Sequence, residues 1–280
     1  MIGLYQDPRA AGPQYWRELL AVLKEPQLKI DRLSLDLLAP ADEEFIKSIA
    51  GIGTPLTVHI CPDTGSDAVR RRLGRHYTTA QLLKTIQLCH QYMIPVTTFF
   101  SAVLAGETRS EMLETWELWD KISSLENIST ARENSLGLGS GVPLGGPIMG
   151  PILLDPGSPA FDSPQKYGYK LLYRNLEEYI AGLSGPSWFQ WLNYETAEMS
   201  KEAIAEMNMQ SAAFAIEQHE SYGLYDASQA SAARERLKWD VLALTEVHRI
   251  LQSGNPRQQE SQLKKLKAKL DDVLAFDDSP

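Results

Sequence analysis

The stretch from residue 56 to residue 108 constrains the fold most, because strand-like and helix-like patterns alternate along it. Residues 56–61 form a short apolar run rich in β-branched side chains, and the turn-forming residues 63–67 end it. Apolar residues at helical spacing follow between 82 and 89, and residues 94–100 form a second apolar run. A strand, a crossover helix and a second strand predict a βαβ unit with a parallel sheet.

The same alternation begins at the N-terminus. Strands are predicted over residues 2–5 and 30–38, and helices over 13–26 and 42–51. A capping-box pattern at 78–81 starts the helix of the βαβ unit. This alternation predicts the α/β class, and we expect an incomplete parallel (β/α) barrel of about five to six strands.

The second half of the chain has a different composition. Residues 136–165 are rich in glycine and proline, which excludes a long helix there, although 152–154 could form a short strand. Helical patterns are predicted over residues 169–181, 200–219, 228–251 and 257–274. We therefore expect a partial barrel over 1–165 and a helical C-terminal extension over 166–280.

Composition excludes several classes of function. The net charge of −9 argues against nucleic acid or an anionic membrane as a partner, and no apolar run is long enough to span a bilayer. The two cysteines, Cys61 and Cys89, cannot form a disulfide framework or a cysteine-rich metal site by themselves. A small-molecule substrate and a reducing cytoplasmic location are expected.

Candidate ligand-binding residues lie where strands are predicted to end, because ligands of parallel α/β folds sit at the carboxyl ends of the strands. Asp63 and Thr64 could hydrogen-bond a ribose, or could equally cap the next helix with Gly65 in the turn. Gly106 has no Cβ and could let a ligand approach the backbone. Glu107 has the alternative role of stabilising the N-terminal turn of the following helix.

Two further groups of residues suggest binding chemistry. His59 and Cys61 lie on one side of a predicted strand and, with Asp63, resemble a metal site, although such residues within a strand are more often packed. Arg70 and Arg75 belong to a basic cluster that could neutralise a carboxylate of a substrate or cofactor. The spacing reveals no catalytic triad, so no catalytic residue is assigned.

Several segments, taken in order, resemble a known family. They are IGLYQDP (2–8), PDTGSDAVRRRLGRHYTT (62–79), IPVTTFFSAVLAGET (94–108), LLDPGSPAFDSPQKYGY (153–169) and SWFQWLNYET (187–196). Their order and spacing are similar to the later barrel strands of radical S-adenosylmethionine (SAM) enzymes. The likeness is greatest to the branch whose full-length members carry an N-terminal cobalamin-binding domain.

The resemblance implies where ligands would bind. The candidates for binding S-adenosylmethionine are Asp63, Thr64, Gly65, Phe100, Ser101, Gly106 and Glu107. Asp155 and Ser158, which follow the barrel, are implied to reach its open mouth and to contact the substrate together with Arg70 and Arg75.

The departure from the family concerns its defining CxxxCxxC loop, whose three thiolates hold a four-iron, four-sulfur cluster. The sequence lacks this motif and resembles the family from its second strand onward. We therefore expect S-adenosylmethionine as a possible cofactor, with the cluster and cobalamin present only if a partner chain supplies them. The chain is not expected to be active alone.

Three hypotheses follow. In the first, the chain is the carboxyl half of a split radical SAM enzyme that performs a radical or methyl-transfer reaction with a cluster-bearing polypeptide. In the second, it is a non-catalytic remnant or binding module. In the third, it is an unrelated α/β enzyme with a metal site at His59, Cys61 and Asp63.

Overall fold

The computed structural model describes residues 2–125, 148–185, 187–253 and 255–275. The chain divides into two compact units, which are described separately. The first comprises residues 1–101, 109–149 and 217–226, and the second comprises 102–108, 150–216 and 227–280. These units interleave along the chain, whereas the division predicted from composition, 1–165 and 166–280, is sequential and stays a prediction.

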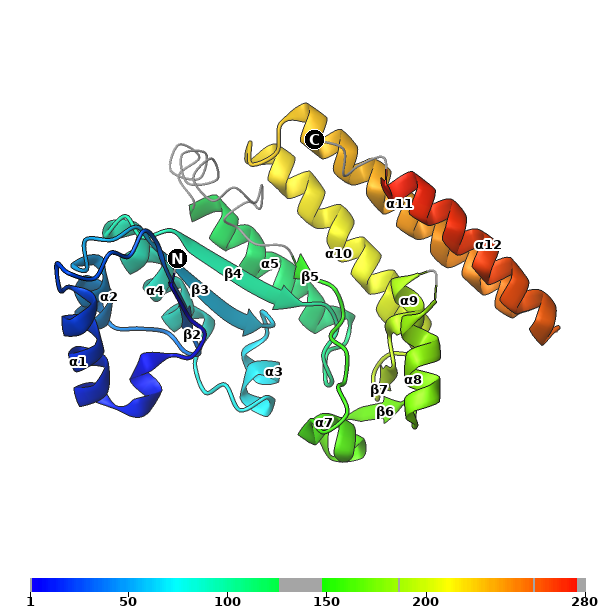
Figure 1. Cartoon of the computed structure of the whole chain (residues 1–280), viewed down its shortest axis with the longest axis horizontal. Helices are drawn as coiled ribbons and strands as arrows, with labels where there is room; N and C mark the ends of the chain where they lie inside the picture. The colour runs from blue at the N-terminus through cyan, green and yellow to red at the C-terminus, as the bar shows by residue number, and fades with distance from the viewer. Residues whose placement is uncertain (1, 126–147, 186, 254, 276–280) are drawn as a thin grey trace. The chain divides into compact units, whose positions relative to one another are not determined.

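The first unit contains a parallel sheet (Figure 1). Its strands are β1 (Ile2–Leu4), β2 (Leu33–Leu37), β3 (Leu56–Asp63), β4 (Val96–Ser101) and β5 (Ile148–Met149). They pair in the order β1-β2-β3-β4-β5, and every pair is parallel. Sequential order is typical of a (β/α) barrel, whereas a doubly wound sheet reverses direction part of the way across. The predicted α/β class with a parallel sheet is confirmed, and the sequential strand order is consistent with the predicted incomplete barrel.

Helices connect the strands of this unit. They are η1 (Pro8–Ala11), α1 (Pro13–Leu23), α2 (Glu43–Ala50), α3 (Asp67–Arg72), α4 (Thr79–Gln91) and α5 (Arg109–Leu125). Local signals fix where they begin: Asp42 accepts a hydrogen bond from the Phe45 N–H of α2, and Thr78 and Gln81 form the predicted capping box of α4.

The core of the first unit lies on the helix-covered face of the sheet. Leu35, Val58 and Ile60 alternate with more polar residues along β2 and β3 and have no exposed surface. Ile46 of α2 and Ile86 of α4 are buried to the same extent. Burying each of these side chains stabilises the unit by about 1.5–3 kcal/mol.

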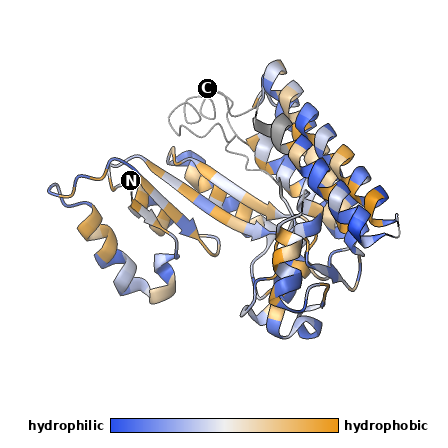
Figure 2. Cartoon of the chain, turned by 45° about the vertical axis from the view of Figure 1, so that its right-hand side comes forward, coloured by the Kyte–Doolittle hydropathy of each residue, from blue (hydrophilic) through white to orange (hydrophobic). Residues whose placement is uncertain are grey.

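The second unit is mainly helical, which confirms the predicted helical C-terminal region. It contains α7 (Pro159–Asp162), η2 (Pro164–Tyr167), β6 (Tyr169–Leu171), α8 (Leu176–Leu183), α9 (Trp188–Trp191), β7 (Tyr194–Thr196), most of α10 (Lys201–Ser221), α11 (Ala227–Leu251) and α12 (Pro256–Ala275). Phe189, Ala205 and Val247 form a buried cluster, against which Leu263 and Leu266 of α12 pack. Figure 2 shows both hydrophilic and hydrophobic residues along α11 and α12, as expected for amphipathic helices. No described helix has the length and apolarity needed to cross a bilayer.

Two local predictions are wrong. Residues 169–181 are not one helix, because Tyr169–Leu171 pairs in antiparallel fashion with Tyr194–Thr196 and the helix α8 begins only after the N-cap Asn175. Residues 152–154 form no strand. The β6–β7 pairing joins segments far apart in sequence, and local periodicity cannot detect such pairing.

Substitution of Gly65 tests the packing of the loop after β3. A Cβ at this position would overlap the backbone of Glu114 and Thr115 on α5. We expect Gly65→Ala to destabilise the chain by about 1–3 kcal/mol in urea unfolding, since the helix must move to make room. Gly51→Ala is the matched control, because a Cβ there has no neighbour closer than 3.5 Å. Equal effects of the two substitutions would contradict the close packing.

A second prediction concerns His219, which is buried between Trp119 and Tyr225 with ring-centroid distances of 4.9 and 4.7 Å. Burial lowers the pKa of His219 from 6.5 to about 4. The unfolded chain therefore binds a proton more readily, and stability is lost as pH falls from 6.5 toward 4. We expect this residue to contribute a loss of about 3 kcal/mol over that range.

The measurement compares urea unfolding of the wild type and His219→Phe across this pH range. The substitution should flatten the pH dependence, whatever it does to stability near neutral pH. Parallel pH profiles for the two proteins would show that His219 is not buried in its neutral form.

Candidate functional site

One face of the parallel sheet is polar. Asp36 of β2 pairs with His59 of β3, and His59 pairs with Thr97 of β4, so the three side chains share a face. Asp36 and His59 are partly exposed, whereas the alternating residues Leu35 and Val58 point to the other face and are buried. Parallel sheets usually have two apolar, covered faces. The polar face is therefore the candidate ligand-binding surface of the first unit.

His59 lies near the centre of this polar face. Its ring stacks on Phe99 with a centroid distance of 5.7 Å and an interplanar angle of 29°. Burial lowers the pKa of His59, and the nearby Asp36 carboxylate opposes the shift. The imidazole is therefore neutral at pH 7, and its Nδ1 atom is buried without a hydrogen-bond partner among the described residues.

Asp63 ends β3 in an unusual conformation. Its φ of 64° lies in the left-handed region, which Asp tolerates better than most residues, and the pairing register with β4 is irregular just before it. The Asp63 carboxylate forms an ion pair with Arg75 at 2.5 Å. Burial raises the pKa of Asp63, and the Arg75 guanidinium opposes this shift. Both side chains keep exposed surface, so the predicted residues Asp63 and Arg75 are brought together at the strand end.

Three other predicted residues of this loop have structural roles. Thr64 and Arg70 have no exposed surface. Arg70 donates hydrogen bonds to the Thr64 carbonyl at 3.2 Å and to the Thr79 hydroxyl at 2.5 Å, and it forms an ion pair with Asp67. The Gly65 N–H donates to Thr115 Oγ1 at 2.7 Å on α5. These groups connect the loop to its helices, and the ligand contacts predicted for Thr64, Gly65 and Arg70 stay predictions.

At the end of β4 the two predicted residues differ in exposure. Phe100 is fully buried and its side chain packs in the core, so its predicted ligand contact stays a prediction. Ser101 is partly exposed, and strand alternation places it on the same face as Thr97 and Phe99. Sequence reasoning missed Phe99, although the period of two along this strand could have identified it.

The remaining predicted residues belong to the second unit. Gly106, with a φ of 87°, donates its N–H to Glu198 Oε2 at 3.0 Å. Glu107 is fully buried and accepts a hydrogen bond from the Leu104 N–H at 2.6 Å, so it stabilises a turn of its own loop. Asp155 is exposed and accepts from the Tyr179 hydroxyl at 3.0 Å. Ser158 caps α7 by accepting from the Phe161 N–H at 3.2 Å.

The residues present do not fit a four-iron cluster. Such a cluster needs three cysteine thiolates from the CxxxCxxC loop, and the 280 residues include two cysteines. Burial raises the pKa of Cys89 to about 12 and also raises the pKa of Cys61, so neither is a ready thiolate. Over the described ranges, no three His, Cys, Asp or Glu side chains come together as a possible metal site. The hypothesis of metal at His59, Cys61 and Asp63 therefore gains no support.

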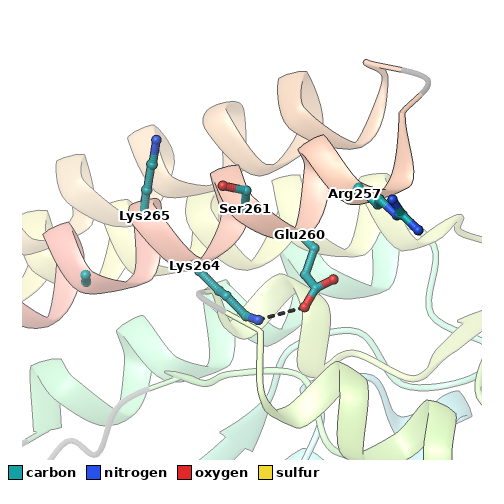
Figure 3. A pocket seen from close by; sticks show the side chains of 6 residues that line it. Arg257, Glu260, Ser261, Lys264 and Lys265 are labelled. Carbon is teal, nitrogen blue, oxygen red and sulfur yellow. Dashed lines mark hydrogen bonds and ion pairs between the residues drawn. The ribbon is translucent and has the colours of Figure 1, made fainter.

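Surface recesses lie elsewhere in the second unit. One of about 490 Å³ follows α12 and is lined by Arg257, Glu260, Ser261, Lys264, Lys265 and Ala268 (Figure 3). Figure 3 shows Lys264 turned toward Glu260, with which it forms an ion pair at 2.7 Å. All of these residues come from one helix, so the recess does not assemble a site from different elements. A second recess of about 460 Å³ lies between α10 and α11.

The sequential parallel strands and the polar sheet face define an α/β domain with a candidate ligand-binding surface. Residues 3–118, which carry most of this sheet, match the model of the radical SAM superfamily. This part of the chain is therefore similar to that superfamily, and the match covers less than half of the 280 residues.

A solved structure is similar to a larger part of the chain. It is described as the cobalamin-dependent S-adenosylmethionine radical enzyme OxsB with aqua-cobalamin bound. The alignment has 14% identity and a TM-score of 0.47, and it covers 94% of this chain but 40% of that one. The chain thus spans well under half the length of that enzyme. No curated protein sequence matches the chain.

The two thiols provide a test of the site. We expect iodoacetamide to modify Cys61 slowly in the native chain and to leave Cys89 unmodified, because burial raises the pKa of both and Cys89 is fully enclosed. Mass spectrometry of the digested protein gives the extent of reaction at each position. The control is the urea-unfolded chain, in which both thiols should react at similar rates. Rapid modification of Cys89 in the native chain would disprove its enclosure.

Proposed function

We propose that these 280 residues form the carboxyl half of a radical SAM barrel and act with a cluster-bearing polypeptide in a radical or methyl-transfer reaction. The observation that carries the proposal is a sheet of this superfamily, with a polar face, in a sequence whose two cysteines do not suit a four-iron cluster. The cluster thiolates would then come from polypeptide outside these residues. Cobalamin, where the reaction uses it, would come from there as well.

The ends of β3 and β4 and the loop that follows β4 in the chain supply the binding groups in this proposal. Asp63 and Ser101 lie at neighbouring strand ends with exposed surface, and they are suited to bind the hydroxyl groups of S-adenosylmethionine. Gly106 would contribute its backbone, and Glu107 would hold the Gly106 turn in shape. S-adenosylmethionine would supply the methyl group or the radical that the reaction uses.

Arg75, Asp155 and Ser158 are the proposed substrate contacts. In the first unit, Arg75 offers a cation beside Asp63. In the second unit, which is considered separately, Asp155 and Ser158 offer a carboxylate and a hydroxyl. These groups suit a polar small molecule. With two free thiols and a net charge of −9, we propose a cytoplasmic setting without nucleic acid.

The edge of the sheet is the proposed contact with the partner polypeptide. Over the described ranges, β1 pairs with β2 along one side only. Ile2 is 39% exposed, and Tyr5, just after the strand, is 77% exposed. An open strand edge with apolar side chains is a template for pairing with another strand.

The proposal predicts binding without catalysis. Isothermal titration should detect S-adenosylmethionine binding to the chain alone, and Asp63→Asn should weaken it about tenfold, because a charged hydrogen-bond acceptor is lost. Asp31→Asn is the control, since Asp31 is an exposed carboxylate before β2. Anaerobic treatment with iron and sulfide should produce no four-iron absorption, and no cleavage of S-adenosylmethionine should occur.

Purification from the native source under anaerobic conditions then separates the hypotheses. The split enzyme requires a polypeptide with a CxxxCxxC segment to co-purify and to restore cleavage of S-adenosylmethionine. If the chain neither binds S-adenosylmethionine nor gains activity with any such polypeptide, the binding-module hypothesis replaces the split enzyme.

A further inference from the structure

The antiparallel strand pair β6–β7 and the residues after β7 contact the loop 102–108, which follows β4 in the chain. The Tyr194 hydroxyl donates a hydrogen bond to the Val103 carbonyl at 3.3 Å. The Ala105 N–H donates to the Tyr169 hydroxyl at 3.3 Å. The Gly106 N–H donates to Glu198, as described above. The β6–β7 pair and Glu198 thus bind the backbone of three residues within one short loop.

The two tyrosines are themselves rigidly held. Tyr194 has no exposed surface and Tyr169 is buried, and their rings pack edge to face with a centroid distance of 5.0 Å. Burial raises the pKa of Tyr194 well above 10, so its hydroxyl stays protonated and remains a donor. Tyr169 lies in β6 and Tyr194 in β7, and the antiparallel register of these two strands fixes their positions.

The loop has a backbone that needs such support. Val103 has a φ of 55°, which is an outlier for a β-branched residue, and it is fully buried. Strained backbone of this kind persists only where surrounding contacts determine it, and it is concentrated at functional sites. The hydrogen bond to the Val103 carbonyl is therefore placed at the strained residue itself.

Asn193, the residue directly before β7, holds a second loop. Asn193 is fully buried, and its side chain bonds both backbone groups of Leu154: it accepts from the N–H at 3.1 Å and donates to the carbonyl at 2.8 Å. Leu154 directly precedes Asp155, a proposed substrate contact. Asn193 therefore mimics a strand partner for a residue that lies outside any strand.

We propose that Tyr169, Tyr194 and Glu198 are positioning residues, which fix the loop 102–108 in a ligand-binding conformation while Asn193 fixes the loop at Leu154. The proposal rests on the proposed function, because only that function makes Gly106 and Asp155 ligand contacts. None of the four residues needs to touch the ligand. They act through the backbone groups that they bind.

Amide hydrogen exchange in the full chain, measured residue by residue by NMR, tests the contacts themselves. Tyr169→Phe should speed exchange at Ala105, and Glu198→Ala should speed it at Gly106, each by about fivefold to tenfold. Glu198→Gln should restore slow exchange at Gly106, since its amide oxygen can accept the same hydrogen bond. Tyr173→Phe and Glu177→Ala are the controls, because these residues lie in the same unit but outside the contacts with this loop.

A titration with S-adenosylmethionine tests the consequence for binding. Tyr194→Phe and Glu198→Ala should raise the Kd about tenfold, Glu198→Gln should return it toward the wild-type value, and the controls should leave it unchanged. A melting temperature recorded for every variant separates general destabilisation from a local effect. Rescue by Glu198→Gln is the result that a purely structural role would not produce.

Each outcome is decisive. Unchanged exchange at Ala105 and Gly106 would overturn the inference, as would faster exchange without any change in Kd. If the wild-type chain binds no S-adenosylmethionine, the proposed function fails. The exchange measurements alone then decide whether the β6–β7 pair and Glu198 hold the loop 102–108.

Discussion

The parallel register of β2, β3 and β4 is the constraint on which the rest of the first unit depends. Because paired residues share a face, the register gathers Asp36, His59 and Thr97 on one side of the sheet. The same register directs the aliphatic residues of these strands toward the helices. A shift of one residue in β3 would exchange the two faces and bury His59. One set of backbone hydrogen bonds thus determines both the core and the candidate ligand surface.

Much of this arrangement could be predicted from the sequence, because its determinants are local. Apolar runs, turn residues and the capping box at Thr78 identified strands β1 to β4 and the helices α1, α2 and α4. The polar face was not recognised, because it requires several strands to be aligned with one another and one strand alone does not give that register. The burial of Arg70 was missed for a similar reason. Its partners lie on the loop after β3 and on α4, and the sequence shows only a run of arginines.

The pairing of β6 with β7 could not be predicted from local sequence patterns. Tyr169–Leu171 is only 3 residues long and pairs with a strand more than 20 positions away, so no periodic pattern could develop. The aromatic segment 187–196 contains the short helix α9 and then the strand β7, so it has no single period. The Tyr194 hydroxyl and the Asn193 side-chain amide bind backbone groups of other loops. A hydroxyl on a buried ring is costly without a partner, and this cost explains why these aromatic residues adopt specific positions.

Neither of the two cysteines is suited to hold a redox-active iron cluster, because burial raises the pKa of both thiols. Cys89 faces the core from α4, where a thiolate would lose its hydration without gaining a cation, and its pKa rises to about 12 accordingly. Cys61 lies on β3 near Asp63, whose carboxylate opposes a second negative charge. The fold therefore uses both cysteines as small, neutral side chains. An iron cluster would need thiolates, which the position of Cys61 on β3 and the position of Cys89 in the core both disfavour.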